Sequence, residues 1–425
     1  MSTTSFTFLN ATGTPALSRS DAKLMRAHIT KTNFANRRQR IIGNEAAKEK
    51  AKRGVLARIG QRQLAQDGAA DALLTDLPLA TPPKDPYRYA QFLARFWSLV
   101  FLDGGNYPSS PDEEAWIQLL VSEAALAEVS MAIGIRHWSP DASCQEKAVA
   151  HSCKAANLIV QHITSETAHT GAVLGAVLSM AIGERLMHND LLWNIHVDGL
   201  ANLITERRSQ GEFDVPPVLC NFLLLDSTND VFNFPLAYHR KIIDKIRPYG
   251  SQPICIVANI SDNLVQLRKS IDRHRKYSSG SDIQAKEIEK WWNSLLCQAR
   301  ALRFDDNPFV QATSRAIELI LHLSWCPQPE ANLTLLAGEL REAWCQLPVR
   351  PCLFMTLTSC QLMLGAVAAG EGSQDRAWFM ATLKGAVLAL RSRGWVRPLE
   401  ILETGFVSDV GLVARFRALW RELDS

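Results

Sequence analysis

The feature that most constrains the fold is an apolar face with helical spacing in residues 288–302. Its side chains recur at i, i+3, i+4, i+7, i+8, i+11 and i+14, which places them along one side of an α-helix. The face consists of Ile288, Trp291, Trp292, Leu295, Leu296, Ala299 and Leu302. Helical spacing dominates from Tyr87 onward, and the alternation typical of strands is scarce. The sequence therefore predicts an all-α fold, a large irregular domain of packed helical pairs.

A second helix is predicted after Asn189 and Asp190, which are good N-cap residues. Its apolar side would contain Leu192, Ile195, Gly199, Leu200 and Leu203. Arg207 and Arg208 would then lie at the negative end of the helix dipole. Proline, glycine and serine separate the helices at residues 138–140, 216–217, 248–250, 278–280, 327 and 348.

Charged residues are distributed unevenly along the chain. Residues 19–62 hold 13 Lys/Arg against 3 Asp/Glu, a net charge of +10, and the remainder of the chain is close to −7 because the total is +3. Four prolines follow within nine residues, at 78, 82, 83 and 86, and they make this the best candidate for a linker. We therefore predict a basic N-terminal arm at 1–65, a linker at 66–86 and a helical regulatory domain at 87–425.

The arm contains two clusters of cations. They are Arg37, Arg38 and Arg40, then Lys48, Lys50, Lys52 and Arg53. The spacing resembles a bipartite nuclear import signal, and the same cations could neutralise DNA phosphates without selecting a base sequence. A solvated, partly disordered helix remains an alternative interpretation. We expect a nuclear protein whose arm directs import and makes nonspecific contact with DNA.

The sequence predicts no metal site and no cofactor. Its nine cysteines include no C-x-x-C pair, so we expect reduced thiols that are mostly packed inside the protein. The histidines lack partners at zinc-ligand spacing. His196 is expected to be a core residue of its helix.

The sequence contains none of the common catalytic signatures, although the chain is long enough to hold an enzyme. We find no G-x-S-x-G, H-E-x-x-H or phosphate-binding glycine loop. Asp305 and Asp306 are the nearest match to a magnesium-binding pair, but Phe309 stands where a further acid would be needed. We interpret them as the start of a helix before Pro308, and predict that the protein is not an enzyme.

Two apolar stretches were compared with the length of a membrane span, roughly 20 residues. Residues 171–183 are too few. Residues 351–370 are uncharged but contain several hydroxyl-bearing and small residues and begin with a proline. A helix buried within a large helical domain explains this stretch better than a membrane span.

Several segments, taken in order, resemble the fungal-specific transcription factor family. In the arm they are residues 6–8, 15, 24–28 and 37–40, and in the body they are residues 96–101, 116, 126–127, 144–163, 193–200, 206–208, 225–226 and 234–235. The resemblance implies an all-helical regulatory domain of the kind that follows a six-cysteine binuclear zinc cluster in fungal activators. This sequence has no cysteine before Cys144, so it contains no such cluster.

The leading hypothesis is a nuclear transcriptional regulator that controls a fungal specialised-metabolite gene set without its own zinc cluster. Its helical domain would bind protein partners of a transcription complex or a small-molecule effector. Two alternatives stay open: a co-regulator that acts only through a zinc-cluster partner, and a helical small-molecule-binding protein or enzyme. An upstream exon encoding C-x-x-C-x₆-C would change the assignment to an ordinary zinc-cluster activator.

Overall fold

The computed structural model describes two sets of residues. The long stretches are residues 123–165, 170–186, 189–211, 253–276, 282–325, 330–348, 359–399 and 412–424, and the short ones are 114, 119–120, 220–221, 223–224, 241–242, 244–245 and 356–357. All of them belong to one compact unit, residues 78–425. The predicted arm and linker lie outside the described residues, and the proposed domain boundaries stay predictions.

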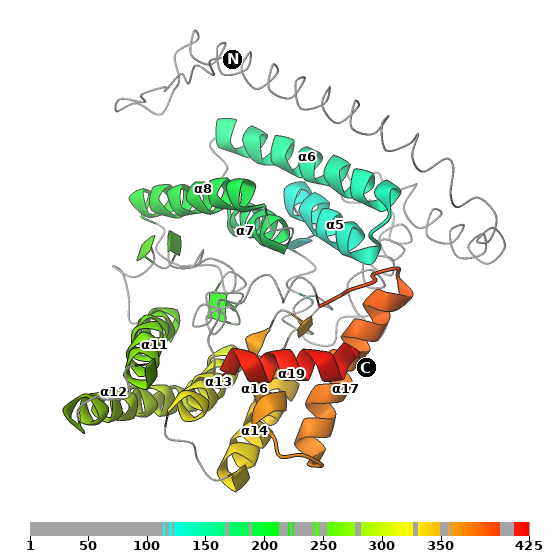
Figure 1. The fold of residues 1–425 in the computed structure, drawn as a ribbon. Helices are drawn as coiled ribbons and strands as arrows, with labels where there is room; N and C mark the ends of the chain where they lie inside the picture. The colour runs from blue at the N-terminus through cyan, green and yellow to red at the C-terminus, as the bar shows by residue number, and fades with distance from the viewer. Residues whose placement is uncertain are drawn as a thin grey trace, which may run out of the picture. The chain divides into compact units, whose positions relative to one another are not determined.

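Every regular element in the described ranges is a helix, which confirms the all-α prediction (Figure 1). Eleven α-helices and one 3-10 helix are described. In chain order they are α5 (Ala124–Trp138), α6 (Ala142–Thr164), α7 (Gly171–Leu186), α8 (Asp190–Ser209), α11 (Pro253–Lys276), α12 (Asp282–Ala301), η2 (Leu302–Phe304), α13 (Pro308–Ser324), α14 (Glu330–Cys345), α16 (Cys360–Ala368), α17 (Gln374–Ser392) and α19 (Leu412–Asp424).

Helices α5 to α8 form two packed pairs. Helix α5 packs against α6 and α7 packs against α8, while α5 also contacts α7 and joins the pairs. Helix α7 is buried along most of its length because small side chains such as Ala172, Ala176 and Ala181 allow its neighbours to approach closely. The short sequence 139–141 separates α5 from α6, as Ser139 and Pro140 predict.

Helix α13 is the centre of the C-terminal helices. It is buried along most of its length, from Phe309 to His322. It contacts α11, α12, α14 and α16, and α16 in turn supports α17 and α19. A helix surrounded in this way has no solvent-exposed polar face, and polar side chains on it must find internal partners.

The buried face of α12 was predicted more accurately than that of α8. All of the α12 set is buried except Trp291, which is half-buried. On α8 the buried face runs instead through Trp193, Val197, Leu200, Ala201 and Ile204, with Leu203 at its edge. The prediction for Leu192 and Ile195 was wrong: both are exposed, because they lie outside the stripe that meets α7.

The uncharged stretch at 351–370 contributes a buried helix, as predicted for the part that is described. Every residue of α16 is buried except Val367, which is partly covered. No helix among the described residues combines the length and apolar character that crossing a bilayer requires.

Candidate functional site

The seven arm cations predicted for nuclear import or phosphate contact all lie outside the described residues. They are Arg37, Arg38, Arg40, Lys48, Lys50, Lys52 and Arg53. Their function therefore stays a prediction.

No group of three or more histidine, cysteine or acidic side chains that could hold a metal is found among the described residues. All seven described cysteines are free thiols. The expectation that the cysteines are packed was wrong for Cys153, Cys297 and Cys345, which are exposed because they lie off the buried faces of their helices. Burial, reinforced by nearby Cys255, raises the pKa of Cys220 to about 11, so its thiol is a poor nucleophile at neutral pH.

Asp305 lies just before the start of α13, where the sequence predicts a helix N-terminus. Its Oδ1 accepts a hydrogen bond from the Asn307 backbone N–H at 2.9 Å, and Asn307 Oδ1 accepts one from the Phe309 N–H at 2.9 Å. Asn307 is therefore the N-cap of α13, with Pro308 at the first helical position. The bond to the Asn307 N–H gives Asp305 a structural role at the start of α13.

Helix α8 carries two of the segments that resemble the fungal family, residues 193–200 and 206–208. Asn189 Oδ1 accepts from the Leu192 N–H at 3.4 Å at the start, and the helix ends at Ser209, just after Arg207 and Arg208. The buried Arg208 donates through Nη1 to the Lys245 carbonyl oxygen. Lys241 Nζ lies 2.8 Å from Asp198 Oδ1. The polar residues of the segment thus attach α8 to residues 241–245.

His196 is half-buried on α8. Burial lowers the pKa of its imidazole, and the negative charge of Glu184 opposes that change only in part. The neutral form is therefore favoured at neutral pH, which suits a packed histidine.

The first buried charged cluster joins α5 to α6. Glu128 is fully buried, His151 Nδ1 lies 2.6 Å from its Oε2, and Lys154 pairs with its Oε1. Burial alone would raise the pKa of Glu128, but hydrogen bonds and positive charge from His151 and Lys154 outweigh it and lower the pKa. The carboxylate is thus ionised and fixes the two helices together.

The second buried charged cluster lies where α12, η2, α13 and α14 meet. Glu318 is fully buried, with Arg300 Nε 3.1 Å from its Oε2 and Arg303 Nε paired with its Oε1. Arg303 also reaches Glu339 through Nη1 at 3.0 Å. Two guanidinium groups therefore neutralise a carboxylate on the central helix.

A buried chain of hydrogen bonds connects the C-terminal helices to residue 224. Trp344 Nε1 donates to Gln361 Oε1 at 2.9 Å, and Gln361 Nε2 donates to Thr313 Oγ1 at 3.2 Å. The Thr313 hydroxyl donates to the Leu224 carbonyl at 3.1 Å. All four residues are buried, so every bond of this chain forms away from water.

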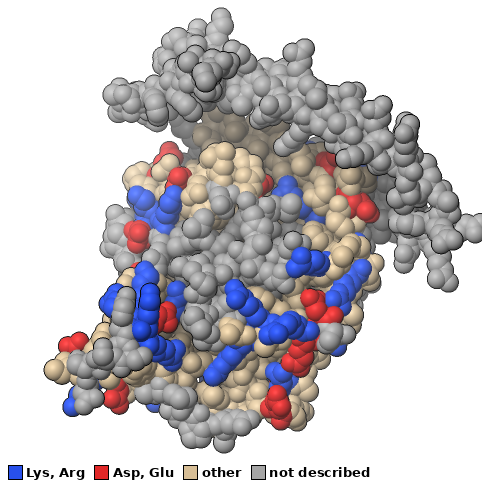
Figure 2. All heavy atoms as spheres, viewed as in Figure 1, with Lys and Arg blue, Asp and Glu red and all other residues tan. Residues whose placement is uncertain are grey.

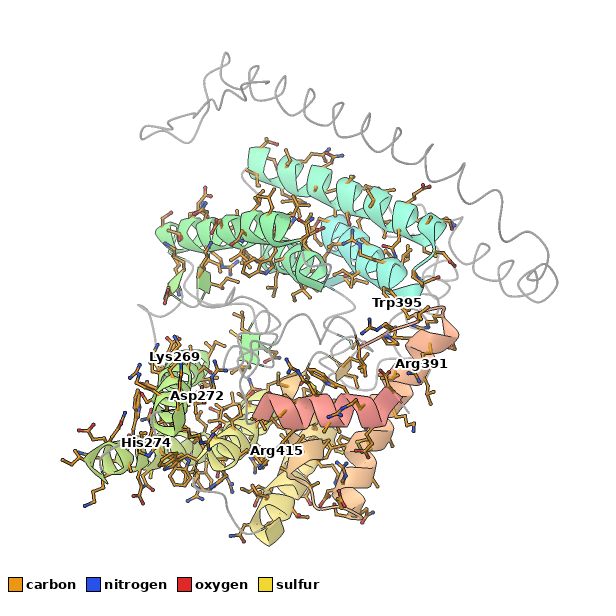
Figure 3. The ribbon with its side chains drawn as sticks, in the orientation of Figure 1. Lys269, Asp272, His274, Arg391, Trp395 and Arg415 are labelled. Atoms are coloured by element: carbon orange, nitrogen blue, oxygen red, sulfur yellow. The ribbon has the colours of Figure 1, made fainter. Side chains whose placement is uncertain are left out.

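Exposed arginines gather at the C-terminal end of the chain. Figure 2 shows Lys and Arg side chains over α11, over α19 and near the end of α17. In Figure 3, Arg415 lies on α19, while Arg391 and Trp395 mark the end of α17. The sequence interpretation missed this surface because it searched for runs of adjacent cations, whereas Arg415, Arg417 and Arg421 are spaced along one helix.

Comparison with known proteins identifies one region. Residues 88–242, less than half of the 425-residue chain, match the model of the Fungal specific transcription factor domain. The match includes α5 to α8 and Leu224, and it excludes the arm and the helices from α11 onward. Neither the curated proteins nor the solved structures gave a significant match. Residues 88–242 are therefore similar to the fungal specific transcription factor domain.

Proposed function

We propose that this chain is a nuclear regulator of a fungal specialised-metabolite gene set, with an arm that directs import and a helical body that binds partners or an effector. The domain match at 88–242 carries the proposal. The two cation clusters of the arm support the nuclear location, because import receptors and phosphates bind closely spaced Lys and Arg.

The import role is tested with a fluorescent fusion in which the seven cluster residues, from Arg37 to Arg53, are replaced by alanine. We expect the fusion to leave the nucleus. The matched control replaces the arm cations that precede the clusters, Arg19, Lys23, Arg26 and Lys31, and it should stay nuclear. Nuclear accumulation of the cluster variant equal to that of the wild type would refute the import role.

The regulatory role is tested by deleting the gene and measuring transcripts. A specialised-metabolite regulator should alter a small, coordinated set of genes, and restoring the full chain should reverse the change. A transcript profile that is indistinguishable from wild type under conditions in which the chain is expressed would contradict the proposal.

A second candidate is a co-regulator that reaches promoters through a zinc-cluster partner. The observation that favours it is that the sequence has no cysteine before Cys144, so the residues ahead of the helical body supply no six-cysteine module. Promoter occupancy of a tagged chain that disappears when the partner is deleted would support this role. Occupancy that persists in the absence of every zinc-cluster partner would exclude it.

A further inference from the structure

Helix α6 carries an apolar stripe on its exposed side. The stripe follows heptad spacing, in which apolar residues recur at alternating intervals of four and three residues. Its members are Val149, Cys153, Ala156, Val160 and Ile163. Because an α-helix turns by about 100° per residue, all five lie within an arc of about 80°. They therefore form one continuous line along the helix.

The stripe is open to solvent. Val149, Val160 and Ile163 are 51%, 56% and 51% exposed, Cys153 is exposed, and Ala156 between them is half-buried. The side of α6 that is buried in the protein is formed by a different set: Cys144, Ala148, Ala155 and Ile159. An exposed helix side is normally polar, so a continuous apolar line there indicates an interaction surface.

The residues that flank the stripe carry no charge. On one flank they are exposed, and they are Ser143, Ala150, Asn157 and Thr164. On the other flank, the side chains of Gln145 and Ser152 are held by α5. Gln145 Nε2 donates to the Arg136 carbonyl oxygen at 2.9 Å, and Arg136 Nη2 donates to Ser152 Oγ at 3.5 Å. The stripe therefore fits an apolar partner helix rather than one that is recognised by charge.

We propose that the stripe of α6 pairs with the stripe of a second copy of this chain, with the two helices antiparallel. A two-fold axis joins a surface to itself, so the surface must be complementary to its own rotated image. The stripe meets this requirement. Its two middle residues, Cys153 and Ala156, are small, and the residue on either side of them is a valine.

The heptad spacing gives the register of the pair. With the axis between residues 154 and 155, Cys153 faces Ala156 of the second copy, and Val149 faces Val160 of the second copy. Two helices that cross at an angle are closest at the crossing point. The small residues would lie at that point and the valines would fill the wider space on each side, as close packing requires.

The position of Glu146 selects the antiparallel orientation. Glu146 continues the heptad beyond Val149 and is the charged residue at the N-terminal end of the stripe. A parallel pair would place two Glu146 carboxylates side by side, where they repel. In the antiparallel pair they lie about 25 Å apart along the axis, well beyond the Debye length of about 8 Å at physiological salt. The inference concerns assembly and does not depend on the nuclear function proposed above.

The test measures the sedimentation velocity of the full chain from about 1 to 100 µM. A single helix pair is a small interface, so we expect a dissociation constant of about 10 µM and a sedimentation coefficient that rises across this range. Val160→Glu should weaken the dimer by about 100-fold or more, because an unpaired charge would be buried in it. A wild-type chain that stays monomeric throughout would overturn the proposal and assign the stripe to a different protein.

The matched control is Gln161→Glu. It adds the same charge at the next residue, which is exposed and lies outside the stripe, and it should leave the dimer intact. Equal weakening by both changes, or a dimer that persists in Val160→Glu, would place the interface elsewhere and overturn the proposal. Unfolding temperatures equal to that of wild type establish that both variants are folded.

The double variant V149K/V160E tests the orientation. The two positions are about 16 Å apart along one helix, so the introduced lysine and glutamate cannot pair within a chain. In the antiparallel dimer the lysine of each copy faces the glutamate of the other, and association should recover at least tenfold relative to Val160→Glu and weaken as salt is added. A double variant that associates as weakly as Val160→Glu would overturn the antiparallel pairing.

Discussion

Arginine has opposite surroundings in two regions of the C-terminal helices. Around Glu318, Arg300 and Arg303 converge on a fully buried carboxylate. On α19, Arg415 and Arg417 project into solvent while the acids of the same helix pair with α17. In the first arrangement the positive charge neutralises a buried carboxylate, and in the second it is exposed to solvent.

The difference shows that an arginine cannot be assigned a function from its charge alone. A buried carboxylate is costly unless it is paired, so the arginines beside Glu318 are required by folding. No such requirement applies to an exposed arginine, whose removal usually changes stability by less than about 0.5 kcal/mol. Stability should therefore respond strongly to the arginines beside Glu318 and weakly to those of α19.

The largest expected effect on stability is that of Arg303→Met. This change leaves Glu318 buried with only the half-exposed Arg300 as partner, and breaking a buried ion pair in this way costs about 3–5 kcal/mol. Arg417→Met on α19 should cost less than about 0.5 kcal/mol. Chemical denaturation of both variants measures the difference.

The cost at Arg303 should be largely reversed by removing Glu318 as well. In R303M/E318L both partners become apolar, so no buried charge is left unpaired. If the double variant is as unstable as R303M, the loss comes from packing or from the Arg303 contact with Glu339, and the electrostatic contrast between the two regions fails.

The next largest effect concerns the packing of α16 against α17, two helices that α19 contacts. A Cβ at Gly365 of α16 would overlap the ring of Phe379 on α17, and that ring is fully buried and has no room to move. Gly365→Ala should therefore cost about 2–3 kcal/mol, toward the upper part of the range for overpacking.

Gly175 of α7 offers a matched control for Gly365. A Cβ there would lie 3.8 Å from Leu126 Cδ1, an ordinary contact. Gly175→Ala should therefore be neutral or stabilise by up to about 1 kcal/mol, because alanine is the better helix former. Equal losses of stability at both glycines would show that the close approach of α16 and α17 is not the reason why alanine is unfavourable at Gly365.

The sequence allowed the fold class and the α12 face to be predicted because apolar spacing at 288–302 has one helical solution. It failed at Leu192 and Ile195, since apolar side chains at nearly every angle of α8 leave its orientation to be decided by α7. The exposure of Arg415, Arg417 and Arg421 on α19 was also missed. Asp424 pairs with Arg391 of α17 only because the two helices pack together. The sequence alone shows arginines and acidic residues together in 412–424 and does not indicate which of them are paired.

A smaller effect tests the connection between the matched domain and the C-terminal helices. Thr313→Val removes the hydroxyl that bonds the Leu224 carbonyl and accepts from Gln361, and should cost about 1–2 kcal/mol because both partners stay buried. Ser261→Ala is the control, since the buried Ser261 hydroxyl makes no hydrogen bond among the described residues. A loss at Ser261 equal to that at Thr313 would argue that the hydrogen bonds of Thr313 do not set the cost.

The smallest effect is a pH dependence at His322, one turn beyond Glu318. Its ring meets Trp292 edge-on at 5.1 Å. Burial, and then the positive charge of Arg300, lower its pKa below 6.5, although Glu318 acts in the opposite direction. Between the folded and unfolded pKa values the unfolded chain binds more protons, so stability is present above about pH 6.5 and falls as the pH is lowered.

This dependence can be isolated by comparing wild type with His322→Gln in urea at pH 7.5 and pH 5.0. Other titrating groups cancel in the difference between the two proteins, so the stability advantage of wild type should shrink at pH 5.0. An advantage that is unchanged or larger at pH 5.0 would mean that the buried ring accepts a proton without penalty. In that case Arg300 and Arg303 would not raise the cost of protonating His322. The difference between the arginines near α13 and those on α19 would then be limited to the ion pairs with Glu318.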